Sequence, residues 1–366
     1  MKKRIAVLGA TGSIGKSSLD VLSKDRDAFD VVLLSAHNDK TKLREIYDSW
    51  PQAVCVLSGE VDGKEKLLAA IGQVRADTVI NGIAGSAGLE PSLAAIEAGS
   101  ALALANKETI VMAGSLVSRL ASEKKSKIIP VDSEHSAIFR MIEAHGRQNT
   151  DEIILTASGG PFRNKTLKEM ENITVEAALA HPTWKMGKKI SIDSASMANK
   201  GLEIIEAAYL FNMPPEKVRV TIHPQSIVHS MLKLHSGAIY AQLSMPDMRQ
   251  PIHDALYWPD IKQGNFPPLS FDSLSLEFEK PDINKFPMLG FAWEAAKLGG
   301  LYTCAYNSAN EIAVAAFFEN RISFLEIPVI VRYVLDRGWA AECGDIRTVL
   351  KADEDARSMA VSYINR

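Results

Sequence analysis

Two acidic residues, Asp132 and Glu134, directly follow an apolar run at residues 128–131. If that run is a parallel strand, the acids lie where ligands collect in open α/β sheets. Side chains two positions apart on an extended chain point the same way, so both carboxylates could bind one hard divalent cation. Solvated surface charges are the alternative, and these residues by themselves leave both open.

A second polar group lies in residues 193–206, which have the spacing of a helix. Asn199 and Lys200 precede Glu203 by four and three positions, so the three side chains share one helical face. A surface Lys-Glu pair is the plain interpretation. However, Gly201 lies within this face, and a glycine inside a helix costs about 1 kcal/mol relative to alanine. Close approach of a ligand would explain it. We also expect Ser194 or Ser196 to cap this helix at its N-terminus. Its buried side should consist of Met197, Leu202 and Ile205.

Two loops between these groups suit a phosphate and a lid. The turn at residues 158–160, Ser-Gly-Gly, offers the Ser158 hydroxyl and exposed amide groups to a phosphate. The loop at 181–189 combines the ionisable ring of His181 with the large aromatic side chain of Trp184, which suits a lid that excludes water. Purely structural roles for both residues are the alternative.

A glycine-rich turn, GATGSIG at residues 9–15, follows the first apolar run and leads into a helical pattern. Glycines let the backbone turn sharply and approach a pyrophosphate, whose charge then meets N–H groups at a helix N-terminus. The spacing is G-x-x-G-x-x-G, and its place after the first strand favours dinucleotide binding over a tight turn without a ligand.

The end of the second predicted strand indicates which dinucleotide binds. An NAD site has an acidic residue there, but this chain has Ala36, followed by His37 and Asn38. Lys40 and Lys42 lie close by in the sequence and supply positive charge for a 2′-phosphate. This favours NADP(H), with a solvated turn and helix face as the alternative.

Short β-branched runs alternate with helical segments from residue 4 to about 131, which predicts a doubly wound, Rossmann-like parallel sheet in an α/β protein. After Asp132 an α+β pattern follows, a proline-rich stretch suits an extended linker, and helical segments end the chain. We expect four parts, at residues 1–131, 132–258, 259–286 and 287–366. The expected strands are 5–8, 31–34, 54–57, 78–80, 101–105, 128–131, 152–156, 218–222 and 238–244, and the expected late helices are 305–318 and 324–335.

The composition of the chain excludes several classes of protein. Hydrophobic residues make up 46% and charged residues 23% of the 366 residues, which excludes a disordered or fibrous chain. The net charge of −3 argues against a nucleic-acid partner. The three scattered cysteines predict no disulfide framework and favour a reducing cytoplasm. The apolar run after the basic N-terminus is too short for a signal peptide, and no run is long enough for a membrane span.

Several strings, taken in order, resemble one family, the 1-deoxy-D-xylulose 5-phosphate reductoisomerases of the non-mevalonate isoprenoid pathway. The resemblance covers about residues 4–300. It rests on GATGSIG from Gly9, LANKE from Leu104, PVDSEHSAIF from Pro130, SGGPFR from Ser158, HPTWKMGKKISIDSASMANKGLE from His181 and MPDMR from Met245.

The resemblance implies roles for individual residues, with Lys107, Glu134, His181 and Glu203 as the catalytic set. Metal ligands, for Mg²⁺, Mn²⁺ or Co²⁺, would be Asp132, Glu134 and Glu203. The substrate phosphate would contact Ser158, Ser194, Asn199 and Lys200, beside His181. The substrate's carbonyl and hydroxyl end would contact Lys107 and Ser133, under a lid of Trp184 and Met186. NADPH would contact Thr11, Gly12, Ser13, Ile14, Asn106, Glu108 and Gly187, besides the turn at Ala36, His37 and Asn38. Family members are homodimers, so residues 132–258 are expected to carry dimerisation as well as catalysis.

The expected reaction converts 1-deoxy-D-xylulose 5-phosphate to 2-C-methyl-D-erythritol 4-phosphate with NADPH and a divalent cation. The cation would polarise the ketone and stabilise the developing oxyanion. Hydride would then pass from the nicotinamide to the new aldehyde. A metal-dependent sugar-phosphate aldolase or isomerase without net redox is one rival. A non-catalytic NADP-binding sensor is the other. Where many members have Gly-Lys-Asn, this chain has Ala-His-Asn at 36–38, which leaves its 2′-phosphate contact open.

Overall fold

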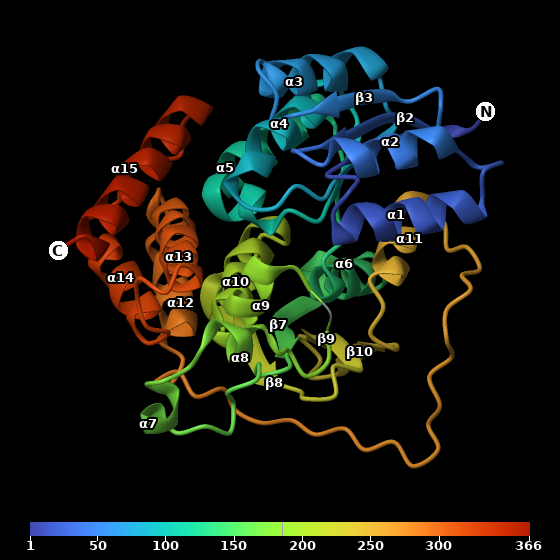
Figure 1. The fold of residues 1–366 in the computed structure, drawn as a ribbon. Helices are drawn as coiled ribbons and strands as arrows, with labels where there is room; N and C mark the ends of the chain where they lie inside the picture. Colours follow the sequence, from blue (N-terminus) through green and yellow to red (C-terminus); the bar gives the residue numbers. More distant parts are fainter. Residues whose placement is uncertain (185) are drawn as a thin grey trace. The chain divides into compact units, whose positions relative to one another are not determined.

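The computed structural model of this chain describes residues 1–184 and 186–366 (Figure 1). They form two compact units. Unit 1 comprises residues 1–109, 117–136 and 247–267, and unit 2 comprises residues 110–116, 137–246 and 268–366. Within the described residues, no helix is both long enough and apolar enough to cross a membrane.

Unit 1 is built on a six-stranded parallel sheet in the order β3-β2-β1-β4-β5-β6. This is the doubly wound arrangement that the sequence predicts, and helices connect the strands. Its strands are β1 (Lys3–Leu8), β2 (Phe29–Ala36), β3 (Val54–Leu57), β4 (Thr78–Asn81), β5 (Ala101–Leu104) and β6 (Ile128–Pro130). Its helices are α1 (Ser13–Lys24), α2 (Lys40–Ser49), α3 (Gly63–Val74), α4 (Leu89–Glu97), α5 (Lys107–Lys124, partly in unit 2) and α11 (Arg249–Tyr257).

Each predicted strand of this sheet is present. The apolar runs of the inner strands are buried on both faces, whereas Val54 and Cys55 of the edge strand β3 are exposed. Residues 5–8 of β1 and 102–104 of β5 are fully buried. Helix α11 returns to this unit from far along the chain. The Nζ atom of Lys3 donates to the carbonyl oxygen of Leu256 at 2.8 Å, and Arg249 forms an ion pair with Asp20 at 3.3 Å.

Unit 2 contains a four-stranded sheet in the order β10-β9-β7-β8, in which only the β7–β8 pair is parallel. The sequence predicts three of these strands, and β9 is the one it missed. The strands are β7 (Thr150–Ala157), β8 (Val218–Ile222), β9 (Val228–Leu234) and β10 (Ile239–Leu243). Helices before and between them are α6 (Ser133–His145, with its first residues in unit 1), α7 (Leu167–Met170), α8 (Val175–Leu179), α9 (Lys188–Ala195) and α10 (Ala198–Leu210).

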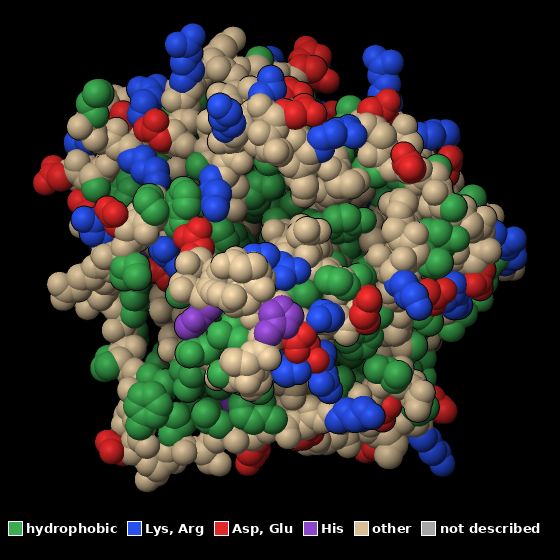
Figure 2. Space-filling view, turned by 180° about the vertical axis from the view of Figure 1, so that it is seen from behind, with side chains coloured by type: hydrophobic (Ala, Val, Ile, Leu, Met, Phe, Trp, Pro, Cys, Tyr) green, Lys and Arg blue, Asp and Glu red, His purple; other side chains and the backbone are tan. Residues whose placement is uncertain are grey.

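Helices α12 (Pro287–Leu298), α13 (Tyr302–Phe318), α14 (Glu326–Leu335) and α15 (Ile346–Ile364) complete unit 2. Figure 1 shows them grouped together in orange and red. Of these four helices, α13 is the most buried. Its buried residues are polar as well as apolar and include Asn307, Ser308 and Asn310. On the face drawn in Figure 2, basic and acidic side chains are interspersed, as the small net charge leads one to expect.

Candidate active site

The glycine-rich turn between β1 and α1 has the geometry of a phosphate cradle. Gly9 adopts a φ of +75°, in the left-handed region that favours glycine. A Cβ on Gly15 would lie 2.5 Å from the Cα of Ala10, so no side chain fits there. Gly12 is the N-cap of α1 and has no side chain to bond the first N–H groups. Thr11, Ser13 and Ile14 thus stand at a helix N-terminus that an anion can approach.

At the end of β2 the residues predicted to select the dinucleotide form a turn. Ala36 is buried, and His37 is exposed with its Nδ1 3.3 Å from the hydroxyl oxygen of Ser58. The ammonium group of Lys42 lies 2.6 Å from the carboxylate of Asp39, which also caps α2. Much of the positive charge of Lys42 is therefore balanced locally.

Asn106 and Glu108, the other expected NADPH contacts, begin α5. The amide nitrogen of Asn106 donates to the carbonyl oxygens of Ile83 and Gly85 at 2.7 and 2.8 Å and to the Glu108 carboxylate at 3.1 Å. Its amide oxygen caps α5 by accepting from the N–H of Thr109 at 3.0 Å. The buried Asn106 side chain therefore joins the loops after β4 and β5.

The acids after β6 do not lie on an extended chain. That expectation is wrong, because β6 ends at Pro130 and α6 begins at Ser133. Asp132 precedes the helix, and its Oδ1 accepts from the backbone N–H of Glu134 at 3.3 Å. The Glu134 carboxylate accepts from the hydroxyl of Ser133. Both acids thus lie at a helix N-terminus, where the helix dipole favours negative charge.

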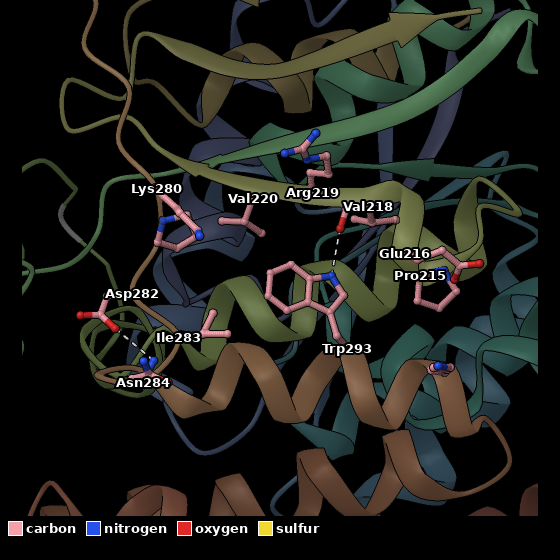
Figure 3. Close-up of a pocket in the computed structure, with 12 residues that line it drawn as sticks. Pro215, Glu216, Val218, Arg219, Val220, Lys280, Asp282, Ile283, Asn284 and Trp293 are labelled. Atoms are coloured by element: carbon pink, nitrogen blue, oxygen red, sulfur yellow. Dashed lines mark hydrogen bonds between the residues drawn. The ribbon is translucent and has the colours of Figure 1, made fainter.

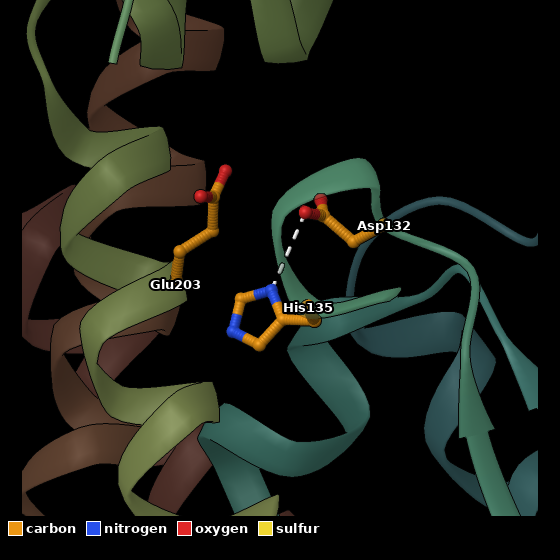
Figure 4. A group of neighbouring side chains, drawn as sticks. All are labelled: Asp132, His135 and Glu203. Carbon is orange, nitrogen blue, oxygen red and sulfur yellow. Dashed lines mark hydrogen bonds and ion pairs between the residues drawn. The ribbon is translucent and has the colours of Figure 1, made fainter. Parts of the chain in front are cut away.

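Asp132 has two further partners in unit 1. Lys107, which is 5% exposed, places its Nζ 2.7 Å from Oδ2 of Asp132, so a predicted catalytic residue and a predicted metal ligand form an ion pair. The other partner is the fully buried His135, whose Nδ1 lies 3.3 Å from Oδ1 (Figure 4). Our sequence reasoning missed His135, although its spacing of three from Asp132 at a helix start could have indicated the contact.

The polar face predicted on α10 is confirmed. Nδ2 of Asn199 donates to Oε1 of Glu203 at 2.6 Å, and Nζ of Lys200 donates to Oε2. Glu203, drawn in Figure 4, is 1% exposed and Lys200 is 4% exposed, so this is a buried ion pair. A buried carboxylate needs such partners, because desolvation without them is costly.

Two details of α10 differ from expectation. Neither Ser194 nor Ser196 is its N-cap. The cap is Met197, in a left-handed conformation, while Ser194 lies in α9. Gly201 does not face a ligand either. A Cβ there would meet the hydroxyl of Tyr306, and it would lie 3.0 Å from Cβ of Ala292 and 3.3 Å from the carbonyl oxygen of Met288. Packing of α10 against α12 and α13 explains the glycine.

Ser158 and His181 come together as the phosphate prediction requires. Nε2 of His181 lies 3.0 Å from the Ser158 hydroxyl, and Nδ1 accepts from the N–H groups of Thr183 and Trp184 at 3.2 and 2.9 Å. These two donors assign the proton of a neutral ring to Nε2. Burial also lowers the pKa of His181. Ser158 Oγ therefore accepts from His181 and, at 3.2 Å, from the N–H of Gly160, and its own proton can turn toward a ligand oxygen.

The remaining residues of this group lie at both ends of α9. Gly160 has a φ of +67°, and a Cβ on it would lie 2.7 Å from the carbonyl oxygen of Ser194, so the Ser158 turn and α9 are in close backbone contact. Gly187 is the N-cap of α9, and Trp184 and Met186 are half-buried. Lys185, within the predicted lid, lies outside the described residues.

A cavity of about 1020 Å³ lies elsewhere in unit 2, between β8, residues 280–284 and α12 (Figure 3). The backbone N–H and C=O groups of even-numbered β8 residues point away from β7. Those of Ile222 form an isolated antiparallel bridge with Glu279. In the same register Pro281 would face Val220, but proline has no N–H to donate. The cavity opens where this pairing ends, and none of the predicted site residues lines it.

Comparison with known proteins covers nearly the whole chain. A family model described as 1-deoxy-D-xylulose 5-phosphate reductoisomerase matches residues 5–62 and 58–114, and models of that enzyme's C-terminal domains match 128–211 and 243–359. The enzyme of this name from Treponema denticola is 48% identical, over 99% of this chain and 97% of the relative. The one from Chlorobium chlorochromatii is 45% identical, over 99% of this chain and all of the relative.

Solved structures of this enzyme also match the chain in fold. The reductoisomerase from Zymomonas mobilis in complex with NADPH is 40% identical, with a TM-score of 0.90 over 100% of this chain and 99% of that one. A DOX-P reductoisomerase in complex with NADPH, fosmidomycin and magnesium is 35% identical, with a TM-score of 0.90 over 99% of this chain and 98% of that one. With identity and fold matching along the full length, this chain belongs to the 1-deoxy-D-xylulose 5-phosphate reductoisomerase family.

Proposed function

We propose that this chain converts 1-deoxy-D-xylulose 5-phosphate to 2-C-methyl-D-erythritol 4-phosphate, with NADPH as reductant and a divalent cation as cofactor. One observation carries this proposal. The relative that holds NADPH, fosmidomycin and magnesium has the same fold over 99% of this chain, at 35% identity. The rival reaction without net redox is not favoured, because the glycine-rich turn and the NADPH-bound relatives both argue for a reduced nucleotide.

The cation site is proposed on Asp132, Glu134 and Glu203. The donor set is a good fit for a hard cation, because it consists of carboxylate oxygens. Asp132 and Glu203 each accept from a nearly buried lysine ammonium group, Lys107 and Lys200, and this pairing supports a site in which positive charge stabilises the carboxylates. When bound, a divalent cation would polarise the substrate's oxygens and stabilise negative charge that develops on them. Mg²⁺ is the first choice, with Mn²⁺ and Co²⁺ as substitutes.

The chain's own residues would bind and orient the substrate. Ser158, Ser194, Asn199 and Lys200 hold the phosphate, with the Ser158 proton directed by His181. Lys107 and Ser133 contact the carbonyl and hydroxyl end, where Lys107 holds or moves a proton at the oxygen. Trp184 and Met186 cover the substrate and exclude water. The support for these roles is the pairing of His181 with Ser158 and of Lys107 with the Asp132 carboxylate.

The NADPH site is proposed at the turn of unit 1. Its pyrophosphate would meet Thr11, Gly12, Ser13 and Ile14 at the N-terminus of α1. Ala36, His37 and Asn38 would receive the 2′-phosphate, with the exposed His37 as its contact. Asn106, Glu108 and Gly187 would border the nicotinamide end, where Asn106 acts by holding the loops rather than through its already bonded amide.

Assembly and location complete the proposal. Residues 1–131 hold NADPH, 132–258 carry catalysis and dimerisation, 259–286 are a linker and 287–366 form the helical domain of a cytoplasmic homodimer. The edge strand β10 supports the dimer, because Ile239 and Tyr240 on it are 55% and 42% exposed. Light scattering of the purified protein tests the dimer.

The reaction is tested by following NADPH absorbance with the sugar phosphate, with and without a chelator. We expect oxidation that the chelator stops and added Mg²⁺ restores. Glu203→Gln should abolish metal-dependent turnover and leave NADPH affinity largely intact. Glu311→Gln, a substitution of the same kind on α13, is the control. Consumption of the substrate without NADPH oxidation would instead support the aldolase or isomerase.

A further inference from the structure

The two helices proposed to hold the substrate phosphate, α9 and α10, both contact α13 through side chains one helical turn apart. Asn310 and Tyr306 lie at positions i+4 and i of α13, and both are fully buried. Asn310 contacts α9, and Tyr306 contacts α10 at Gly201. Nothing in the sequence indicated a role for these C-terminal helices in the chemistry.

The contact with α9 is a hydrogen bond to a buried carboxylate. Nδ2 of Asn310 donates to Oδ1 of Asp193 at 2.8 Å, and Lys189 lies 3.0 Å from Oδ2. Asp193 is 1% exposed and directly precedes Ser194, a proposed phosphate contact. Because both oxygens of Asp193 are bonded, one to the next helix and one along α9, the end of α9 cannot turn or slide without breaking a charge-assisted bond.

The amide oxygen of Asn310 indicates the role of its hydrogen bond to Asp193. Within the described residues, Oδ1 of Asn310 is buried and has no hydrogen-bond partner. The buried, unpartnered acceptor offsets part of the stability that the charge-assisted bond to Asp193 contributes. The amide is kept at this position despite that cost, which points to orientation of α9 as its role.

We propose that Asn310 is a positioning residue, which sets the phosphate-binding Ser194 through Asp193. This inference rests on the proposed phosphate role of Ser194. The Tyr306 contact at Gly201 holds α10 at the same time, so that α13 sets both helices relative to each other. Asn310 itself touches neither substrate nor cofactor.

The test compares two buried asparagines of α13. Asn307 is also fully buried with an unpaired Oδ1, but its Nδ2 donates within its own helix, to Glu311 at 3.2 Å. Asn310→Leu should raise the KM for the sugar phosphate about tenfold, with the KM for NADPH unchanged. Asn307→Leu should change neither KM. Asn310→Leu should lower the thermal stability more than Asn307→Leu, because it leaves the buried Asp193 carboxylate without its amide donor.

Equal KM values for Asn310→Leu and Asn307→Leu would overturn the positioning role. Should Asn310→Leu not fold, Asn310→Ala removes the same bond with a smaller side chain and provides the same comparison. Ser194→Ala separates this inference from the proposed function. A normal KM there contradicts the phosphate role itself, whereas a raised KM there beside a normal one for Asn310→Leu contradicts only the role of Asn310.

Discussion

Gly201 offers a quantitative test of how α10 is packed. A Cβ at this position would lie 3.0 Å from Cβ of Ala292, 3.3 Å from the carbonyl oxygen of Met288 and closer still to the Tyr306 hydroxyl. Overpacking of this kind costs about 1 to 3 kcal/mol. Alanine recovers about 1 kcal/mol of helix propensity. Gly201→Ala should therefore lower the free energy of unfolding by about 1 kcal/mol and at most about 2.

Urea denaturation of single and double variants measures this effect. Tyr306→Phe removes the atom nearest to the added methyl group and should itself cost about 1 kcal/mol, because its hydrogen bond to the Met288 carbonyl oxygen, 3.2 Å long, is lost. The double variant should be more stable than the sum of the two losses by about 1 kcal/mol. Gly290→Ala is the control. It lies inside α12, has nothing within 4 Å of an added Cβ, and should not be destabilising.

The result that would refute this reasoning is equally specific. If Gly201→Ala unfolds at the same urea concentration as the wild type while its KM for the sugar phosphate rises, the glycine makes room for a ligand. Additive losses in the double variant would show that the Tyr306 hydroxyl is not the atom in the way.

Two further predictions concern the ligand sites. A protonated His181 ring cannot accept the N–H groups of Thr183 and Trp184 at Nδ1, and burial lowers the pKa of this ring. The KM for the sugar phosphate should therefore stay level above about pH 6.5, the ordinary histidine pKa, and rise at lower pH. His181→Gln should lose the part of this rise that the substrate's own titration does not explain, and an identical profile in both proteins would contradict it. Gly15→Ala, whose Cβ would meet the backbone of Ala10 at 2.5 Å, should weaken NADPH binding at least about tenfold by fluorescence titration, whereas Gly72→Ala, which has open space, should not. Equal affinities in these two variants would show that the turn does not bind the nucleotide.

Local patterns along the chain were sufficient to predict much of this protein. Buried apolar runs and turn glycines depend on neighbouring residues, so the six strands of the first sheet and the turn at residues 9–15 were predicted correctly. The same holds for the polar face of α10, since positions three and four apart on a helix meet whatever surrounds it.

Tertiary contacts decided what local patterns could not. Asp132 and Glu134 lie at the start of a helix that begins at Ser133, and not on a continued strand. Gly201 is needed for a helix that lies about a hundred residues further along the chain, and no local spacing reports that neighbour. Asp193 and Asn310 are likewise joined only in the fold. Sequence determines which side chains can share a face, but packing of distant elements in space decides which of these faces meet, and why a residue is small, buried or charged there.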